Sequence, residues 1–80
     1  RKPMNIETFI KQFKDLHEEP DAVQITASTL FRDLDEYSSL LALTIVAMVD
    51  EEYDVAIKAE DLRKAQTIED LFNIIKEKKA

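Results

Sequence analysis

Two adjacent serines, Ser38 and Ser39, are the residues of this 80-residue chain best placed for covalent chemistry. They directly precede a long apolar run that begins at Leu40, so we expect them at the start of a helix. A serine at that position can cap the helix by accepting a hydrogen bond from a backbone N–H group. It can also carry a phosphodiester, because the unpaired N–H groups and the dipole at a helix N-terminus favour an anion. From these residues alone, capping is the simpler interpretation and the covalent role stays open.

The remaining reactive side chains do not suggest an enzyme. His17 is the single histidine, and because it stands beside Glu18 and Glu19 at the end of a helical segment, we expect it to face solvent or to be partly packed. The acidic run from Asp50 to Asp54 lacks the spacing and the glycine of a calcium-binding loop. One histidine and no cysteine also exclude a multi-histidine or thiolate metal site. We therefore expect a non-catalytic protein with no catalytic residues and no metal.

The charge and the hydropathy of the chain indicate which kinds of partner and which cellular compartment to expect. The chain has 17 acidic and 11 basic residues, a net charge of −6, which argues against binding to nucleic-acid phosphates. Nine acids and one base fall between residues 33 and 61, and this segment, with a net charge of −8, would attract basic partner surfaces. A solvated face that only keeps the protein in solution is the alternative. No apolar run is long enough to span a membrane and no signal peptide is visible, so we expect a cytoplasmic monomer without membrane insertion.

The elements that must position these residues are predicted to be helices. The chain contains no glycine, which disfavours tight β-hairpins and excludes glycine-rich phosphate loops. Residues 21–37 read as a long, packed loop, because apolar side chains are spread along it. Apolar spacing and capping residues predict helices over residues 5–18, 38–53, 59–64 and 67–78. We expect an all-α fold, a small four-helix bundle of three main helices and one short helix, with residues 1–80 as a single domain.

Two of these helices have recognisable N-terminal signals. Asn5 is a favourable N-cap residue directly before the first apolar stripe. Thr67 stands three residues before Asp70, which is a variant of the capping box. Pro20 is expected to end the first helix, because the residue before a proline is pushed out of the α region.

The second predicted helix is apolar on almost every side. Such a helix is either central to the fold or presents apolar surface to a partner. We assign one face to the core, formed by Ala42, Ile45, Val46, Val49 and Tyr53. A second apolar face is left over, and an 80-residue chain has little protein to cover it; it consists of Leu40, Leu43 and Ala47.

Four stretches, in their order and spacing, resemble the acyl carrier proteins. They are Phe31-Arg32-Asp33-Leu34, Ser39-Leu40, the segment from Asp50 to Ile57, and Thr67-Ile68-Glu69-Asp70-Leu71. The family pattern is an Asp-Leu loop, an Asp-Ser-Leu site, a helix ending in acids and an aromatic residue, a following Ile, and a Thr-hydrophobic-x-Asp start to the last helix. The resemblance covers residues 5–76. It implies a carrier domain in which 4′-phosphopantetheine, derived from coenzyme A, is bound covalently to a serine and holds acyl groups as thioesters.

The register of the resemblance distinguishes the two serines. Counting back from Tyr53 and Ile57 puts the attachment position at Ser39, with Ser38 the less favoured choice. Ser38 then stands where the family has an Asp that assists the phosphopantetheinyl transferase, and Asp35 stands where the family usually has a small residue. These departures suggest a specialised set of partners.

The resemblance also implies a docking surface on the second helix. Leu41 and Thr44 occupy positions that are acidic in the family, so we expect partner contacts to be more apolar near the start of this helix. The expected docking residues are Leu40, Leu43, Ala47, Asp50, Glu51 and Asp54. The implied partners are a phosphopantetheinyl transferase and acyl-handling enzymes of fatty acid, polyketide or similar biosynthesis that have basic surfaces.

The sequence leaves two questions open, the identity of the cargo and the presence of the prosthetic group. The cargo could be a fatty acyl, polyketide, aminoacyl or D-alanyl group. The same bundle could also serve as a protein-interaction module without a prosthetic group, a reading that the serine at position 38 favours.

Overall fold

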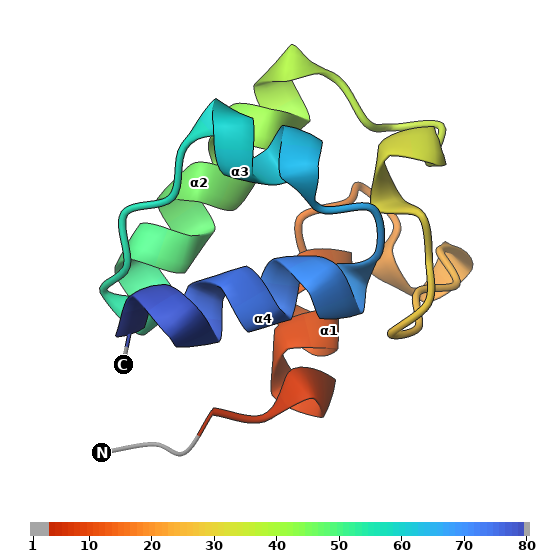
Figure 1. The fold of residues 1–80 in the computed structure, drawn as a ribbon. Helices are drawn as coiled ribbons and strands as arrows, with labels where there is room; N and C mark the ends of the chain where they lie inside the picture. Colours follow the sequence, from red (N-terminus) through yellow and green to blue (C-terminus); the bar gives the residue numbers. More distant parts are fainter. Residues whose placement is uncertain (1–3, 80) are drawn as a thin grey trace.

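Helices account for most of the described chain. The computed structural model describes residues 4–79, so the ends of the expected domain, residues 1–3 and 80, lie outside the described residues. Within residues 4–79 there is no strand, which confirms the predicted all-α bundle of three main helices and one short helix. The α-helices are α1 (Ile6–Lys14), α2 (Ser39–Tyr53), α3 (Ala59–Lys64) and α4 (Ile68–Lys79) (Figure 1).

α1 begins where the sequence predicts but ends four residues before the predicted end at residue 18. Asn5 Oδ1 accepts a hydrogen bond from the N–H of Glu7 at 2.7 Å, as expected for an N-cap. After Lys14, the N–H groups of Leu16 and His17 pair with carbonyls three residues back rather than four. The backbone therefore tightens out of the α-helix well before the proline.

His17 is buried, so the expectation of a solvent-facing or partly packed histidine was wrong. Only 5% of the residue is exposed. The tightened turn folds the imidazole back onto the ring of Phe13, with 5.8 Å between the ring centroids. Nδ1 lies 3.2 Å from the carbonyl oxygens of Phe13 and Lys14. Because a carbonyl only accepts, Nδ1 carries the hydrogen and adds a second donor to two carbonyls that already accept from the N–H groups of Leu16 and His17.

The buried face of α2 is rotated from the predicted one. Its fully buried residues repeat every four positions: Leu41, Ile45, Val49 and Tyr53. Ala42 and Val46, which were assigned to the core, are only half-buried, because the six-residue α3 covers them incompletely. Leu41 was expected at the surface in place of an acidic docking residue, but only 8% of it is exposed. That expectation was wrong, since the stripe that begins at Leu41 faces the interior.

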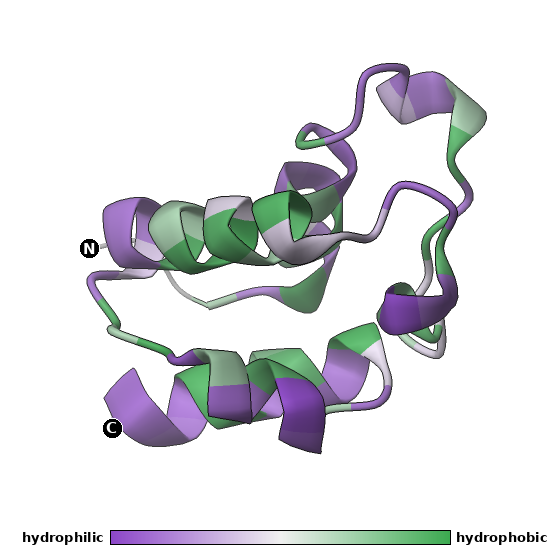
Figure 2. Ribbon diagram, turned by 90° about the horizontal axis from the view of Figure 1, so that it is seen from above, coloured by the Kyte–Doolittle hydropathy of each residue, from purple (hydrophilic) through white to green (hydrophobic). Residues whose placement is uncertain are grey.

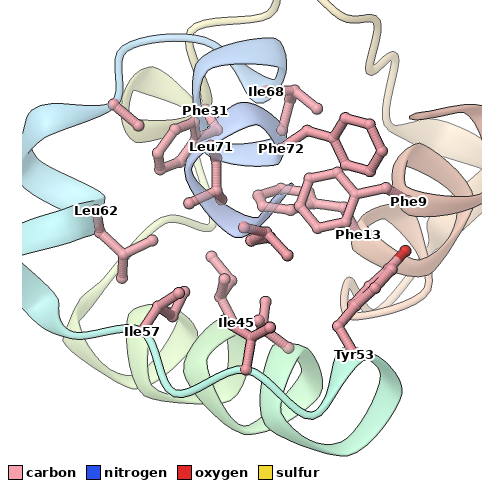
Figure 3. Packing of buried hydrophobic residues seen from close by; sticks show 14 of the residues in the cluster. Phe9, Phe13, Phe31, Ile45, Tyr53, Ile57, Leu62, Ile68, Leu71 and Phe72 are labelled. Carbon is pink, nitrogen blue, oxygen red and sulfur yellow. The ribbon is translucent and has the colours of Figure 1, made fainter. Parts of the chain in front are cut away.

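The core is assembled from all four helices and from the long first loop. Phe9 of α1 packs against Phe13 on its own helix and against Phe72 of α4, and Ile45 contributes from α2 (Figure 3). Phe31 lies in the 3-10 turn Phe31–Asp33, is fully buried, and packs edge-on against Phe13 with centroids 5.9 Å apart. A second 3-10 turn, Pro20–Ala22, shortens the loop further. The loop is therefore packed as expected, and it leads directly into the start of α2.

The N-terminus of α4 carries the predicted capping box. The N–H of Asp70 donates to Thr67 Oγ1 at 3.0 Å. In return, Asp70 Oδ2 accepts from the N–H groups of Thr67 and Gln66, both at 3.1 Å. The bond from the Thr67 N–H, followed by that from Gln66, holds the pKa of Asp70 below its ordinary value. The box is satisfied in both directions, so this helix start is well defined.

The C-terminal end of α2 is fixed by two side chains from other helices. Lys79 Nζ donates to the carbonyl oxygen of Tyr53 at 2.6 Å. The Tyr53 hydroxyl donates to Gln12 Oε1 at 2.5 Å, which ties α2 to α1. Burial, and secondarily the charge of Glu52, raises the pKa of Tyr53. Asp54 ends the helix in the left-handed conformation at φ 56°, a position that a glycine often takes.

Candidate functional site

The two serines have different surroundings. Ser38 is the N-cap of α2, with an extended backbone, and its Oγ accepts a hydrogen bond from the N–H of Leu41 at 3.2 Å. Ser39 is the first residue of the helix and is exposed. Its hydroxyl makes no hydrogen bond to any other residue that the structure describes. Capping therefore uses Ser38, while the Ser39 hydroxyl is available for reaction at the positive end of the α2 dipole.

Ser39 lies on the rim of a groove between α2 and α3. The groove has a volume of about 460 Å³, which is within the range of small-molecule sites. Tyr37, Ser38 and Ser39 line one part of it. Apolar side chains from both helices and from the segment between them form most of its wall: Ala42, Leu43, Val46, Ile57, Ala59 and Leu62. A group attached to Ser39 would have an apolar surface beside it.

Two basic residues that the sequence analysis did not single out also line this groove. Lys58 is the N-cap of α3, and Arg63 belongs to its last turn. Both are exposed. Sequence reasoning missed them because nothing in a six-residue helix shows which side will face Ser39. One signal was present, however: Lys58 is the only base among residues 33–61.

The six residues expected to contact partners are all exposed on or directly after α2. Leu40 is 75% exposed and Leu43 is 67% exposed, which are high fractions for leucines. With Ala47 they form an apolar stripe at helical spacing, and acids continue it toward the C-terminal end; these are Asp50, Glu51 and Asp54. The apolar body of α2 and its hydrophilic C-terminal end stand out in Figure 2. We call these six residues the α2 stripe.

Comparison with protein families gives one match to the chain. Residues 11–75, more than half of its length, match the family described as the phosphopantetheine attachment site. The chain belongs to this family of carrier domains. No solved structure matches it significantly. Membership confirms the resemblance to carrier proteins, the prosthetic group 4′-phosphopantetheine, and a carrier role that is not catalytic.

The described part of the carrier domain fits this prosthetic group. An exposed, unbonded serine hydroxyl at a helix start offers both a nucleophile and a favourable place for the phosphate.

Within residues 4–79 no group of three or more His, Asp or Glu side chains is arranged to hold a metal ion. Over the same residues, no helix combines the length and the hydropathy that crossing a bilayer requires.

Another pocket of the carrier domain lies away from Ser39, between the end of α1 and the first loop. It has a volume of about 390 Å³. His17 borders it together with four carboxylates, Glu18, Glu19, Asp35 and Glu36. His17 Nε2 is buried and has no hydrogen-bond partner among the described residues. The pocket shares no lining residue with the groove at Ser39.

Proposed function

We propose that this protein is a discrete acyl carrier that bears 4′-phosphopantetheine on Ser39. The arm would present acyl groups, as thioesters, to enzymes of fatty acid, polyketide or a similar biosynthesis. The observation that carries the assignment to Ser39 is the division between the two serines. Ser38 Oγ is engaged in capping α2, whereas the Ser39 hydroxyl is exposed and makes no bond to a described residue.

Attachment is a transfer from coenzyme A. Ser39 Oγ forms a bond to the phosphorus next to the pantetheine portion, and the pyrophosphate P–O bond breaks. Adenosine 3′,5′-bisphosphate leaves, and the hydroxyl proton passes to the transferase or to solvent. Once attached, the group supplies a terminal thiol that holds the acyl cargo, which explains how a chain without cysteine can carry a thioester. The N–H groups at the start of α2 favour the resulting phosphodiester anion.

The α2 stripe supports a docking role. Its leucines offer apolar contact close to Ser39, and its acids lie within the segment that carries a net charge of −8. This combination suits partners with basic rims around an apolar patch, and the charge would speed their encounter. We include a phosphopantetheinyl transferase and acyl-handling enzymes among these partners. Residues 1–80 are proposed to act as one monomeric carrier domain in the cytoplasm, with aminoacyl or D-alanyl groups as the alternative cargo.

Intact-mass measurement tests the attachment site. The protein is incubated with coenzyme A and each of several phosphopantetheinyl transferases, and the mass gain of one phosphopantetheinyl group is followed over time. We expect the gain in the unmodified sequence and in Ser38→Ala, and no gain in Ser39→Ala. Loading of Ser39→Ala, or no loading of the unmodified sequence by any transferase, would contradict the proposal. Circular dichroism of each variant checks that loss of loading is not loss of folding.

A further inference from the structure

The groove beside Ser39 has a charge opposite to that of the whole protein. The chain has a net charge of −6, and the segment 33–61 alone has −8. Yet the charged residues that line the groove are both basic, Lys58 and Arg63, and no carboxylate is among its lining residues. A cationic rim on an apolar groove is therefore a local feature that the overall composition does not predict.

Neither basic side chain forms an ion pair with a residue that the structure describes. The ion pairs among the described residues are Lys11 with Asp15 and Lys78 with Asp61, so Lys58 and Arg63 take part in none. Two acids, Glu60 and Asp61, stand between them in the sequence, and neither lines the groove. The Asp61 carboxylate is engaged elsewhere. Its Oδ2 accepts from the backbone N–H of Lys58 at 2.9 Å and lies 3.7 Å from Lys78 Nζ.

Lys58 is also an unfavourable choice for the helix it begins. It is the N-cap of α3, where the helix dipole is positive and where a cation is destabilising. Serine, threonine, asparagine and aspartate are preferred at this position. Arg63 is in the last turn, where the dipole favours a cation, so local structure accounts for Arg63 but not for Lys58. Both side chains are long and line the same groove, so they border the same space beside Ser39.

Resting on the proposed function, we infer that the acyl cargo of this carrier bears a carboxylate, which Lys58 and Arg63 bind while the apolar body of the cargo lies in the groove. Charge complementarity selects this occupant. A neutral acyl chain would use the apolar wall and leave both cations without a partner. The arm's own phosphate is the other anion nearby, but it already faces the N–H groups at the start of α2.

The test compares two cargoes of equal carbon number that differ only in the terminal group, a methyl or a carboxylate. Ser39 is loaded by a transferase from hexanoyl-coenzyme A or from adipoyl-coenzyme A, which have six carbons each, and loading is verified by intact mass. Thermal unfolding is then measured for the two loaded forms and for the form that carries the arm alone. Since an exposed ion pair stabilises weakly, we expect the adipoyl form to melt about 2–6 °C above the hexanoyl form at low salt. The difference should shrink at high salt because screening weakens the pairs.

Variants of Lys58 and Arg63 test whether these two side chains cause the difference in melting temperature between the adipoyl and hexanoyl forms. Lys58→Gln and Arg63→Gln should each remove roughly half of the adipoyl advantage, because each deletes one of two charges. The double variant should abolish it. Lys64→Gln is the matched control, because Lys64 is an exposed base on the same helix that does not line the groove, and it should leave the difference intact.

Three outcomes would overturn the inference. The first is equal melting temperatures for the two loaded forms. The second is a difference that the double variant leaves unchanged. The third is equal destabilisation of the arm-only and adipoyl forms by the double variant, which would assign the two cations to the arm's phosphate. A protein that loads at Ser39 but shows any of these keeps its proposed function, whereas failure to load overturns both.

Discussion

Replacing each serine in turn should separate stability from loading. Ser38→Ala removes the Oγ that accepts from the Leu41 N–H at 3.2 Å and leaves that donor without its cap. Loss of an N-cap of this kind costs about 1 kcal/mol of unfolding free energy. For a domain of this size, about 1 kcal/mol corresponds to a fall of about 4–8 °C in melting temperature.

Ser39→Ala should behave differently. The side chain makes no hydrogen bond within the described chain, and alanine is at least as favourable inside a helix. We expect a change in unfolding free energy within about 0.5 kcal/mol of zero. Ser38→Asp is the matched control, since aspartate also caps and its charge suits the helix dipole, so it should retain or exceed the original stability.

Thermal and urea unfolding followed by far-UV circular dichroism measure these effects on the form without the arm. Equal destabilisation by Ser38→Ala and Ser39→Ala would refute the division of roles. So would a Ser38→Ala variant as stable as the unmodified protein, because the capping bond would then contribute nothing.

Two further predictions concern the packing of α2 and the cap of α4. Leu41→Ala should cost about 2–5 kcal/mol of unfolding free energy because the side chain is buried. The neighbouring Leu40→Ala should change the unfolding free energy by less than about 0.5 kcal/mol, because Leu40 is exposed. If urea unfolding gave similar losses for the two variants, the rotated buried face of α2 would be disproved. The pKa of Asp70 is lower in the folded protein than its ordinary value of 3.8. The Asp70 carboxylate therefore stabilises the fold at pH values above 3.8, and this stabilisation is lost as the pH falls through the folded-state pKa. Asp70→Asn should therefore lower the melting temperature at pH 7 and have little effect at pH 2, and a pH-independent effect would exclude this linkage.

Local signals in the sequence predicted the helices well. Asn5 and Thr67 form the expected caps, because capping depends on residues within one turn of each other. The choice of Ser39 as the proposed attachment serine also rests on spacing, and Ser39 and Tyr53 do lie on one continuous helix. These features need no knowledge of how the helices pack.

One error is local, since α1 ends at Lys14 and not at residue 18. The others concern how side chains pack. α2 is apolar on nearly every side, so its sequence does not determine which stripe faces inward, and Leu41 was assigned to the wrong side. His17 is buried because a tightened turn returns the ring to Phe13, which helical periodicity does not anticipate. The two bases at the groove depend on α3 lying across α2, a tertiary arrangement that no local pattern encodes.

The arrangement at the start of α2 has a consequence for a carrier that is used repeatedly. The hydroxyl that holds the first turn in place and the hydroxyl that we propose accepts the arm belong to neighbouring residues, so addition or removal of the arm would break no bond that supports the helix. The form without the arm should therefore keep the same helix start as the form that carries it.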